Sequence, residues 1–264
     1  RHIVTCEVEH ASILNPLKQL EGLGYQIERL PVDRVGRVDP ERVQDALLES
    51  TLLVTIQQAN SEVGTLQNIL KIGSYVREKG ILFHTDAIQS VGKMPVDVNR
   101  LPIDLLSISS HKLYGPKGIG ALFIKRGTPA LFTPVCGGGQ ETKRRGGTEN
   151  VPGIVGFGKA CQLAKEHING GELKRLEKIR DYLWKKIEYL IPNVELFGCM
   201  ESRLPNTLGC GFKGAHGETL LIALDIEGIS VSTGSACSSG MGLPSPVLSA
   251  MNLPVDKINS SLRF

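Results

Sequence analysis

Short apolar runs alternate with helix-length segments along the first half of the chain, and this alternation limits the folds open to it. The runs "HIVTC", "YQIERL", "LLVTIQ" and "ILFHTD" are strand-like. Strands that alternate with helices are typical of βαβ units, which build a mostly parallel sheet. Continuous apolar runs such as "LLVTI" are expected where parallel strands are buried on both faces. We therefore predict an α/β fold.

Helical patterns separate these strands. One covers residues 12–20, a second begins at Pro40 and reaches residue 49, and a third runs over residues 69–79 and stops before Gly80. Further on, "DLLSIS" and "IGALFIK" are joined by too few residues for a helical crossover. A parallel pair needs such a crossover, so we expect these two strands not to be parallel.

The pair Gly170–Gly171 is the best candidate for a domain boundary, because it separates two helical patterns. We predict a large domain over residues 1–169 and a small C-terminal α/β domain over residues 170–264, with short strands near residues 194 and 207, a helix from Glu218 and a strand at "GISVS". The chain starts without Met in a strand-like run and stops in mid-element. We therefore expect a fragment in which both domains are incomplete.

Composition excludes several classes of protein. A formal net charge of +3, without a long basic tract, does not favour direct nucleic-acid binding. No apolar run approaches the roughly 18 residues of a membrane span, and no signal peptide opens the chain. The 6 cysteines are scattered, without metal-like spacing, which argues against a metal or iron–sulfur protein. Reduced thiols and a cytoplasmic location are expected.

Polar residues follow three of the predicted strands, where parallel sheets bind ligands. They are the pair Asn60–Ser61, then Asp86, and then the stretch "SSHK" from Ser109 to Lys112. A buried lysine amine and a buried carboxylate at one sheet edge suit pyridoxal phosphate, which needs an amine for its aldehyde and an acid for its ring nitrogen. A structural ion pair of Asp86 and Lys112 is the alternative.

One cysteine differs from the rest. Cys237 lies in "SVSTGSACSSGMG", a stretch of small residues that provides mobility and access for a reactive thiolate. The other five are expected to be buried or structural, since free cysteines usually are. These are Cys6, Cys136, Cys161, Cys199 and Cys210.

Five motifs together resemble the group I cysteine desulfurases. They are "HTDAIQSVGK", "SSHKLYGPKGIGALFIK", "GGGQETKRRGGTEN", "RLPNTLGCGF" and "STGSACSSG", and the resemblance spans essentially the whole chain. These proteins are fold-type-I pyridoxal phosphate enzymes close to the selenocysteine lyases. The resemblance implies conversion of L-cysteine to L-alanine, with a persulfide formed on Cys237 and passed to a sulfur acceptor, either an iron–sulfur scaffold or a tRNA-thiolation carrier.

The resemblance also implies a cofactor site. Lys112 would form the Schiff base and Asp86 would pair with the ring nitrogen. Gln89 would bond the ring hydroxyl, and Ser109 and His111 would hold the phosphate. These roles agree with the chemistry of the side chains, because serine and histidine donate hydrogen bonds to phosphate oxygens.

Further roles follow from the same resemblance. His10 would stack on the ring and assist proton transfer, as a group that titrates near neutral pH can. Thr148 would reach the phosphate from the other subunit of a homodimer. Arg263 would bind the substrate carboxylate, which its planar fork matches.

Two departures from the family pattern leave alternatives open. Ser61 stands where the family usually has a second asparagine that contacts cofactor and substrate, so we expect weaker binding there or binding rebuilt through Asn60. The family's upstream phosphate-binding segment is also absent from the sequence. The alternatives to a cysteine desulfurase are a selenocysteine lyase and a non-catalytic scaffold subunit that keeps the fold.

Overall fold

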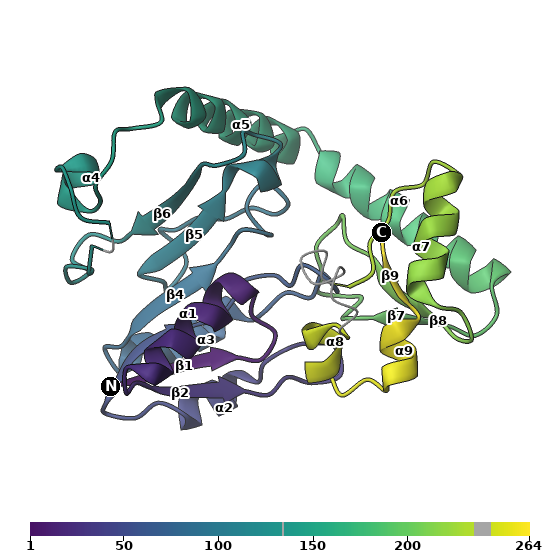
Figure 1. The fold of residues 1–264 in the computed structure, drawn as a ribbon, viewed down its shortest axis with the longest axis horizontal. Helices are drawn as coiled ribbons and strands as arrows, with labels where there is room; N and C mark the ends of the chain where they lie inside the picture. Colours follow the sequence, from purple (N-terminus) through teal and green to yellow (C-terminus); the bar gives the residue numbers. More distant parts are fainter. Residues whose placement is uncertain (134, 235–243) are drawn as a thin grey trace.

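Two β-sheets organise the chain (Figure 1). The computed structural model describes residues 1–133, 135–234 and 244–264. A six-stranded sheet is built from the first half of the described chain, and a three-stranded sheet from the second. Among the described residues, no helix combines the length and apolarity that crossing a bilayer requires.

The larger sheet has the order β2-β1-β3-β4-β5-β6. Its strands are β1 (His2–Cys6), β2 (Gln26–Leu30), β3 (Thr51–Thr55), β4 (Leu82–Asp86), β5 (Leu105–Ser109) and β6 (Gly120–Ile124). All neighbours are parallel except β5 and β6, which are antiparallel. Both the mostly parallel α/β fold and the non-parallel last pair are confirmed.

Three helices connect the parallel strands. They are α1 (Ala11–Gly22), α2 (Pro40–Asp45) and α3 (Ile69–Glu78), and a polar side chain accepts a backbone hydrogen bond at the start of each. The helix predicted over residues 40–49 ends at Asp45 instead. Leu48 N donates to Thr51 Oγ1 over 2.8 Å, so the chain already turns toward β3 there.

The core of this region lies between the sheet and α3. Val54, Phe83 and Leu106 from adjacent strands pack with Ile72 and Val76 from the helix. Residues distant in sequence complete the same core, since Leu248 and Met251 also belong to it. The C-terminal part of the chain therefore helps to bury the large sheet.

The second half of the chain is richer in helices. It contains η1 (Ser110–Leu113), α4 (Gln140–Lys143), α5 (Val151–Asn169), α6 (Glu172–Leu190), β7 (Val194–Phe197), β8 (Gly209–Phe212), α7 (Gly217–Ile226), α8 (Pro246–Ala250), α9 (Val255–Asn259) and β9 (Ser261–Arg263). The small sheet is antiparallel, in the order β7-β8-β9. In Figure 1, α5 and α6 lead from the large sheet to the small one.

The strand predicted at "GISVS" is wrong. Only Ser232 pairs there, through an isolated bridge to Arg263, the last residue of β9. Ile229 and Ser230 are exposed, and Ile229 N donates to Leu224 O of α7 over 2.8 Å instead of to a strand. The domain boundary near residue 170 stays a prediction, although Gly171, with a φ of 81°, does separate α5 from α6.

Candidate active site

The carboxyl ends of four parallel strands bring distant polar residues to one edge of the sheet. β1 leads to His10, β3 leads to Asn60, β4 ends at Asp86, and β5 leads to Lys112. Hydrogen bonds of the backbone and of side chains connect the segments at these strand ends. Gln58 N donates to Asp86 O over 2.9 Å, and Asn60 Nδ2 donates to Val8 O over 3.3 Å. Parallel topology thus gathers the predicted residues as expected.

Asp86 is the buried carboxylate of this edge. Its side chain is 7% exposed, and Oδ1 accepts a hydrogen bond from Ile88 N over 2.9 Å. Burial raises the pKa of Asp86 above its usual value, while the Ile88 amide and the charge of His10 oppose that rise. Such a carboxylate would be stabilised in its ionised form by a cation placed against it.

His10 lies beside this carboxylate, at the start of α1. Its Nδ1 accepts a hydrogen bond from Ser12 N over 3.1 Å and lies 2.8 Å from Ser12 Oγ. The imidazole is exposed and its charge acts on Asp86. Because Nδ1 caps the helix, the side of the imidazole ring that carries Nε2 is left to face a ligand.

Lys112 stands in η1, directly after β5, and is half-buried, although the sequence suggested a buried amine. Within the described part of the chain, the structure gives its Nζ no hydrogen bond and no ion pair. The alternative of a structural Asp86–Lys112 ion pair is therefore not realised there. In the same turn, Ser109 Oγ lies 2.8 Å from His111 Nδ1, and the buried Ser110 Oγ has no partner.

Gln89 lies three residues beyond Asp86 and contacts a second lysine. Lys93 Nζ donates to Gln89 Oε1 over 2.8 Å. The sequence analysis missed Lys93, although it belongs to the quoted motif "HTDAIQSVGK". No local signal marks Lys93, because the segment from Gln89 to Lys93 is a turn and not a helix.

The small sheet contributes the predicted substrate arginine. Arg263 Nη1 donates to Ser61 O over 2.9 Å, which brings β9 to the loop that follows β3. Asn60 is buried, and its Oδ1 accepts hydrogen bonds from the backbone amides of Glu62 and Val63. Since the Asn60 amide already shapes this turn, its role toward the substrate stays a prediction.

Two further predicted site residues are Thr148 and Cys237. Thr148 is exposed, in the segment between α4 and α5, and its contribution to another subunit stays a prediction. Cys237 lies outside the residues that the structure describes.

The other five cysteines differ in how deeply their side chains are buried. Cys6, Cys199 and Cys210 are buried as predicted, whereas Cys161 is only half-buried and Cys136 is exposed.

Glu9 is a further buried acid that the sequence analysis missed, although it directly precedes His10. Its Oε1 accepts hydrogen bonds from Gln57 N over 2.6 Å and from Cys6 Sγ over 3.1 Å. Burial raises its pKa to about 8, and the Asp86 charge adds to the rise. Glu9 therefore joins the ends of β1 and β3 as a largely neutral acid at pH 7.

These residues fit pyridoxal phosphate. Asp86 is a buried carboxylate that would gain from a cationic ring nitrogen, and Lys112 is an amine without an acidic partner in the described chain. Gln89, Ser109 and His111 add polar groups around them. An acid, an amine and phosphate-binding groups at one sheet edge match the parts of this cofactor.

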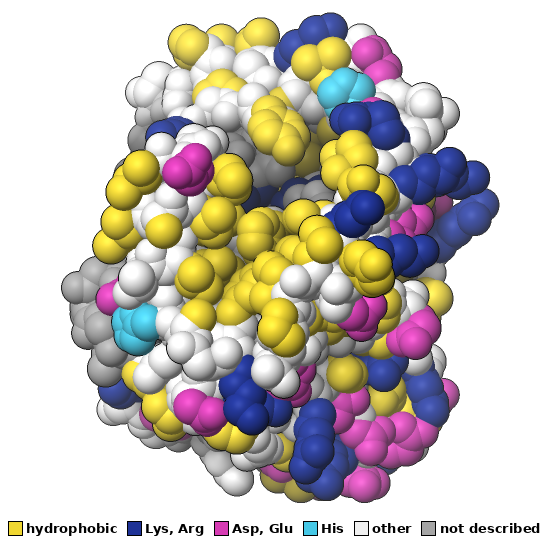
Figure 2. Space-filling model, turned by 90° about the vertical axis from the view of Figure 1, so that its right-hand side faces the viewer, with side chains coloured by type: hydrophobic (Ala, Val, Ile, Leu, Met, Phe, Trp, Pro, Cys, Tyr) yellow, Lys and Arg dark blue, Asp and Glu magenta, His cyan; other side chains and the backbone are white. Residues whose placement is uncertain are grey.

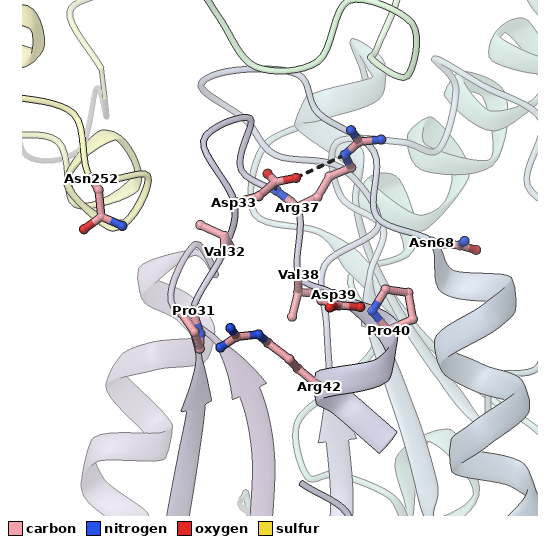
Figure 3. Close-up of a pocket in the computed structure, with 10 residues that line it drawn as sticks. All are labelled: Pro31, Val32, Asp33, Arg37, Val38, Asp39, Pro40, Arg42, Asn68 and Asn252. Carbon is pink, nitrogen blue, oxygen red and sulfur yellow. Dashed lines mark hydrogen bonds and ion pairs between the residues drawn. The ribbon is translucent and has the colours of Figure 1, made fainter. Parts of the chain in front are cut away.

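A separate hollow of about 680 Å³ lies elsewhere on the large region (Figure 3). Its lining includes Asp33 and Arg37, which form an ion pair over 3.6 Å, and Arg42 of α2. Asn252, just beyond α8, approaches from the C-terminal part of the chain. None of the predicted site residues lines it, so it is not part of the candidate active site.

Comparison with known proteins shows what the whole chain resembles. The aminotransferase class-V family matches residues 1–264. "Cysteine desulfurase IscS" of Dictyoglomus turgidum is 48% identical over 264 residues, covering 100% of this chain and 66% of that protein. Among solved structures, a "NifS-like protein" has a TM-score of 0.91 and 36% identity, covering 100% of this chain and 69% of that one. "SspA in complex with cysteine" has a TM-score of 0.83 and 32% identity, covering 99% and 72%.

Proposed function

The chain belongs to the aminotransferase class-V family of pyridoxal phosphate enzymes, in its cysteine desulfurase group, and from this membership we propose that it takes sulfur from L-cysteine and releases L-alanine. The chain spans 66% of the length of the curated relative reported above, so the proposal concerns the whole protein that contains it. One observation carries the proposal: Asp86 ends β4 and Lys112 follows the adjacent parallel strand β5, so both lie at one edge of the sheet, with Gln89 in the turn after β4.

In this proposal each residue has a defined task toward the cofactor. Asp86 balances the charge of the ring nitrogen, and Ser109 and His111 hold the phosphate. Bound pyridoxal phosphate supplies an electron-withdrawing ring that stabilises negative charge at the substrate carbon. Lys112 Nζ takes the proton from that carbon, and His10, which follows β1 at the same sheet edge, assists proton transfer.

Substrate binding and sulfur transfer are assigned to the C-terminal part. Arg263 binds the substrate carboxylate through its planar guanidinium. The Cys237 thiolate attacks the substrate sulfur, the carbon–sulfur bond breaks, and the carbon regains a proton to give L-alanine. The thiol of Cys237 and one L-cysteine thus become one persulfide and one L-alanine. Sulfur then passes to an iron–sulfur scaffold or a tRNA-thiolation carrier.

Other parts of the proposal rest on the family alone. A cytoplasmic homodimer would place Thr148 of one subunit at the phosphate of the other. The relatives carry the name cysteine desulfurase, which favours L-cysteine over L-selenocysteine as the substrate. The rates on the two amino acids, measured side by side, test that preference.

The proposal is tested by trapping the cofactor on the protein. The whole natural protein is incubated with pyridoxal phosphate, reduced with borohydride, digested and examined by mass spectrometry. We expect a pyridoxyl adduct on Lys112 and L-alanine production from L-cysteine in the unreduced sample. Absence of any adduct, or an adduct on Lys93 alone, contradicts the proposed site.

Two cysteine variants, one at the proposed sulfur carrier and one as a control, separate cofactor binding from sulfur transfer. Cys237→Ala should keep the adduct on Lys112 and lose persulfide formation. The matched control is Cys136→Ala, because that thiol is exposed and has no assigned role. Persulfide on a Cys237→Ala protein at the wild-type level would remove Cys237 from the mechanism.

A further inference from the structure

The turn that follows β4 ends in a lysine for which the proposed reaction has no task. Lys93 is half-buried, and its Nζ donates a hydrogen bond to Gln89 Oε1 over 2.8 Å. Gln89 is the residue assigned to the ring oxygen of the cofactor. A contact between the two therefore bears on how the cofactor is held.

The turn that carries Lys93 is held firmly against the site. Lys93 N donates to Ser90 O over 2.9 Å, and Ser90 Oγ donates to Gln58 Oε1 over 2.6 Å. Gly92 has a φ of +80°, and a Cβ at this position would overlap the side chain of Leu113. Because Leu113 is the neighbour of Lys112 in η1, this close approach sets the turn beside the cofactor lysine.

The electrostatic surroundings of Lys93 are unfavourable for a lysine. Burial, together with the charges of Lys112 and Arg263, lowers its pKa to about 8. Within residues 1–133, 135–234 and 244–264, the structure gives Lys93 no ion pair with an acid. A desolvated cation without a counter-charge costs stability, and such groups cluster at functional sites.

The chemistry of the two side chains determines which end of the Gln89 amide faces Lys93. A glutamine has an accepting oxygen at one end and a donating NH₂ at the other, whereas a lysine ammonium can only donate. The contact with Lys93 therefore uses Oε1 of Gln89. Within the described residues the structure gives the NH₂ end no acceptor, and the ionised ring oxygen of pyridoxal phosphate is one that it can serve.

We propose that Lys93 is a positioning residue that holds Gln89 Oε1 and so presents the Gln89 NH₂ group to the ring oxygen of the bound cofactor. Lys93 acts through Gln89 and makes no contact with the substrate. This inference rests on the proposed function, because it requires that pyridoxal phosphate binds between Asp86 and Lys112. Without Lys93, the amide turns and presents either end to the ring oxygen.

The test compares five variants of the whole natural protein. They are Lys93→Met, Lys93→Arg, Gln89→Ala, the double variant with Gln89→Ala and Lys93→Met, and the exposed-surface control Lys18→Met. For each, the dissociation constant of pyridoxal phosphate is measured by absorption titration, together with the pH midpoint of the bound cofactor's absorption change. Thermal unfolding is recorded in parallel.

We expect Lys93→Met to weaken cofactor binding about tenfold, because one hydrogen bond to a charged oxygen is lost. The pH midpoint should rise, since a nearby positive charge and a donor to the ring oxygen are both removed. Lys93→Arg retains a donor-only cation and should stay within about twofold of wild type, as should Lys18→Met. Once Gln89 is alanine, adding Lys93→Met should change binding by less than about twofold.

Each contrary result has a distinct meaning. If wild type binds pyridoxal phosphate and Lys93→Met binds it equally well with the same midpoint, the inference is overturned and the proposed function stands. If Lys93→Met weakens binding equally with and without Gln89, Lys93 does not act through Gln89, and the inference is again overturned. If wild type binds no pyridoxal phosphate, both proposals fall. Should Lys93→Met not fold, Lys93→Gln takes its place in the same cycle.

Discussion

Two helices, one from each region, bury their apolar residues to opposite extents. α3, beside the large sheet, buries Ile69, Ile72, Gly73 and Val76. α7, beside the small sheet, has the more apolar sequence "GETLLIALDI", yet only Gly217 is buried there. Figure 2 shows hydrophobic side chains gathered on the face of the molecule where the second region lies.

The spacing of the apolar residues explains the difference. In α3 they recur at intervals of three and four residues, so they form one face that packs on the sheet. In α7 they surround the helix, and Ile222 and Ile226 remain 59% and 79% exposed. Apolar content therefore does not decide burial, which depends on the pattern and on what the structure places opposite it.

The two regions also differ in the chemistry assigned to them. The large region carries Asp86, Gln89 and Lys112, which are assigned to the cofactor. The C-terminal region carries Arg263, which is assigned to the substrate and reaches the large region through Ser61 O. Variants in the two regions should therefore affect different steps.

The largest expected effect is on stability. Ile72→Ala should destabilise the protein by about 2–5 kcal/mol, because a buried isoleucine leaves a cavity in the core. Ile226→Ala should change stability by less than about 0.5 kcal/mol, because its side chain is mostly exposed. Urea unfolding of the whole natural protein measures both. A large cost for Ile226→Ala would show that another surface covers α7 and would remove the contrast between the two helices.

The next effect concerns the substrate. Arg263→Gln should raise the KM for L-cysteine about 10–100-fold, because hydrogen bonds to a charged carboxylate contribute roughly 1.5–3 kcal/mol. The affinity for pyridoxal phosphate should not change, in contrast to Gln89→Ala. Steady-state kinetics and cofactor titration provide the two readouts, with the exposed Arg34→Gln as the matched control. Equal losses of cofactor and substrate binding would contradict the division between regions.

The last expected effect is a gradual change of stability with pH. Glu9 is held with a pKa of about 8 against an ordinary value of 4.5, so folding takes up a proton between these values. As the pH rises through this window, wild type should lose stability relative to Glu9→Gln by up to about 1.4 kcal/mol per pH unit. Below pH 4.5 the difference should be constant.

Denaturant unfolding at several pH values measures this difference. The matched control is Glu227→Gln, which removes one carboxylate from the exposed end of α7. A pH-independent difference between wild type and Glu9→Gln would show that Glu9 is ionised inside the folded protein. The buried position of Glu9 would then accommodate a carboxylate charge as readily as the exposed position of Glu227 does.

Local patterns were sufficient to predict most of the large region. The alternation of apolar runs and helical segments predicted β1, β3, β4 and the parallel sheet, and the short connection predicted the antiparallel β6. The strand at "GISVS" was wrong because, among the described residues, the segment pairs only through the Ser232–Arg263 bridge, while Ile229 N bonds back to α7. A strand is stable only when another strand lies beside it and hydrogen-bonds to it. Whether such a strand is present depends on the tertiary fold, not on the local sequence.

The residues of the candidate site also fall into those that the sequence predicted and those that it did not. Asp86 and Lys112 could be predicted because each directly follows an apolar strand, and His10 and Arg263 were added by the resemblance to the cysteine desulfurases. Lys93 and Glu9 could not, because neither a lysine in a turn nor an acid before a histidine is informative by itself. Their importance lies in which groups surround them.

The sequence by itself determined the strand and helix types, the parallel sheet and the residues at the strand ends, because these depend on hydrophobic periodicity and local turns. Only the tertiary structure decided which side chains meet. It brought Arg263 to Ser61, buried Glu9 between two strand ends and set Lys93 against Gln89. These contacts depend on burial and on charges contributed by residues that are distant in the sequence. No local sequence pattern therefore encodes them.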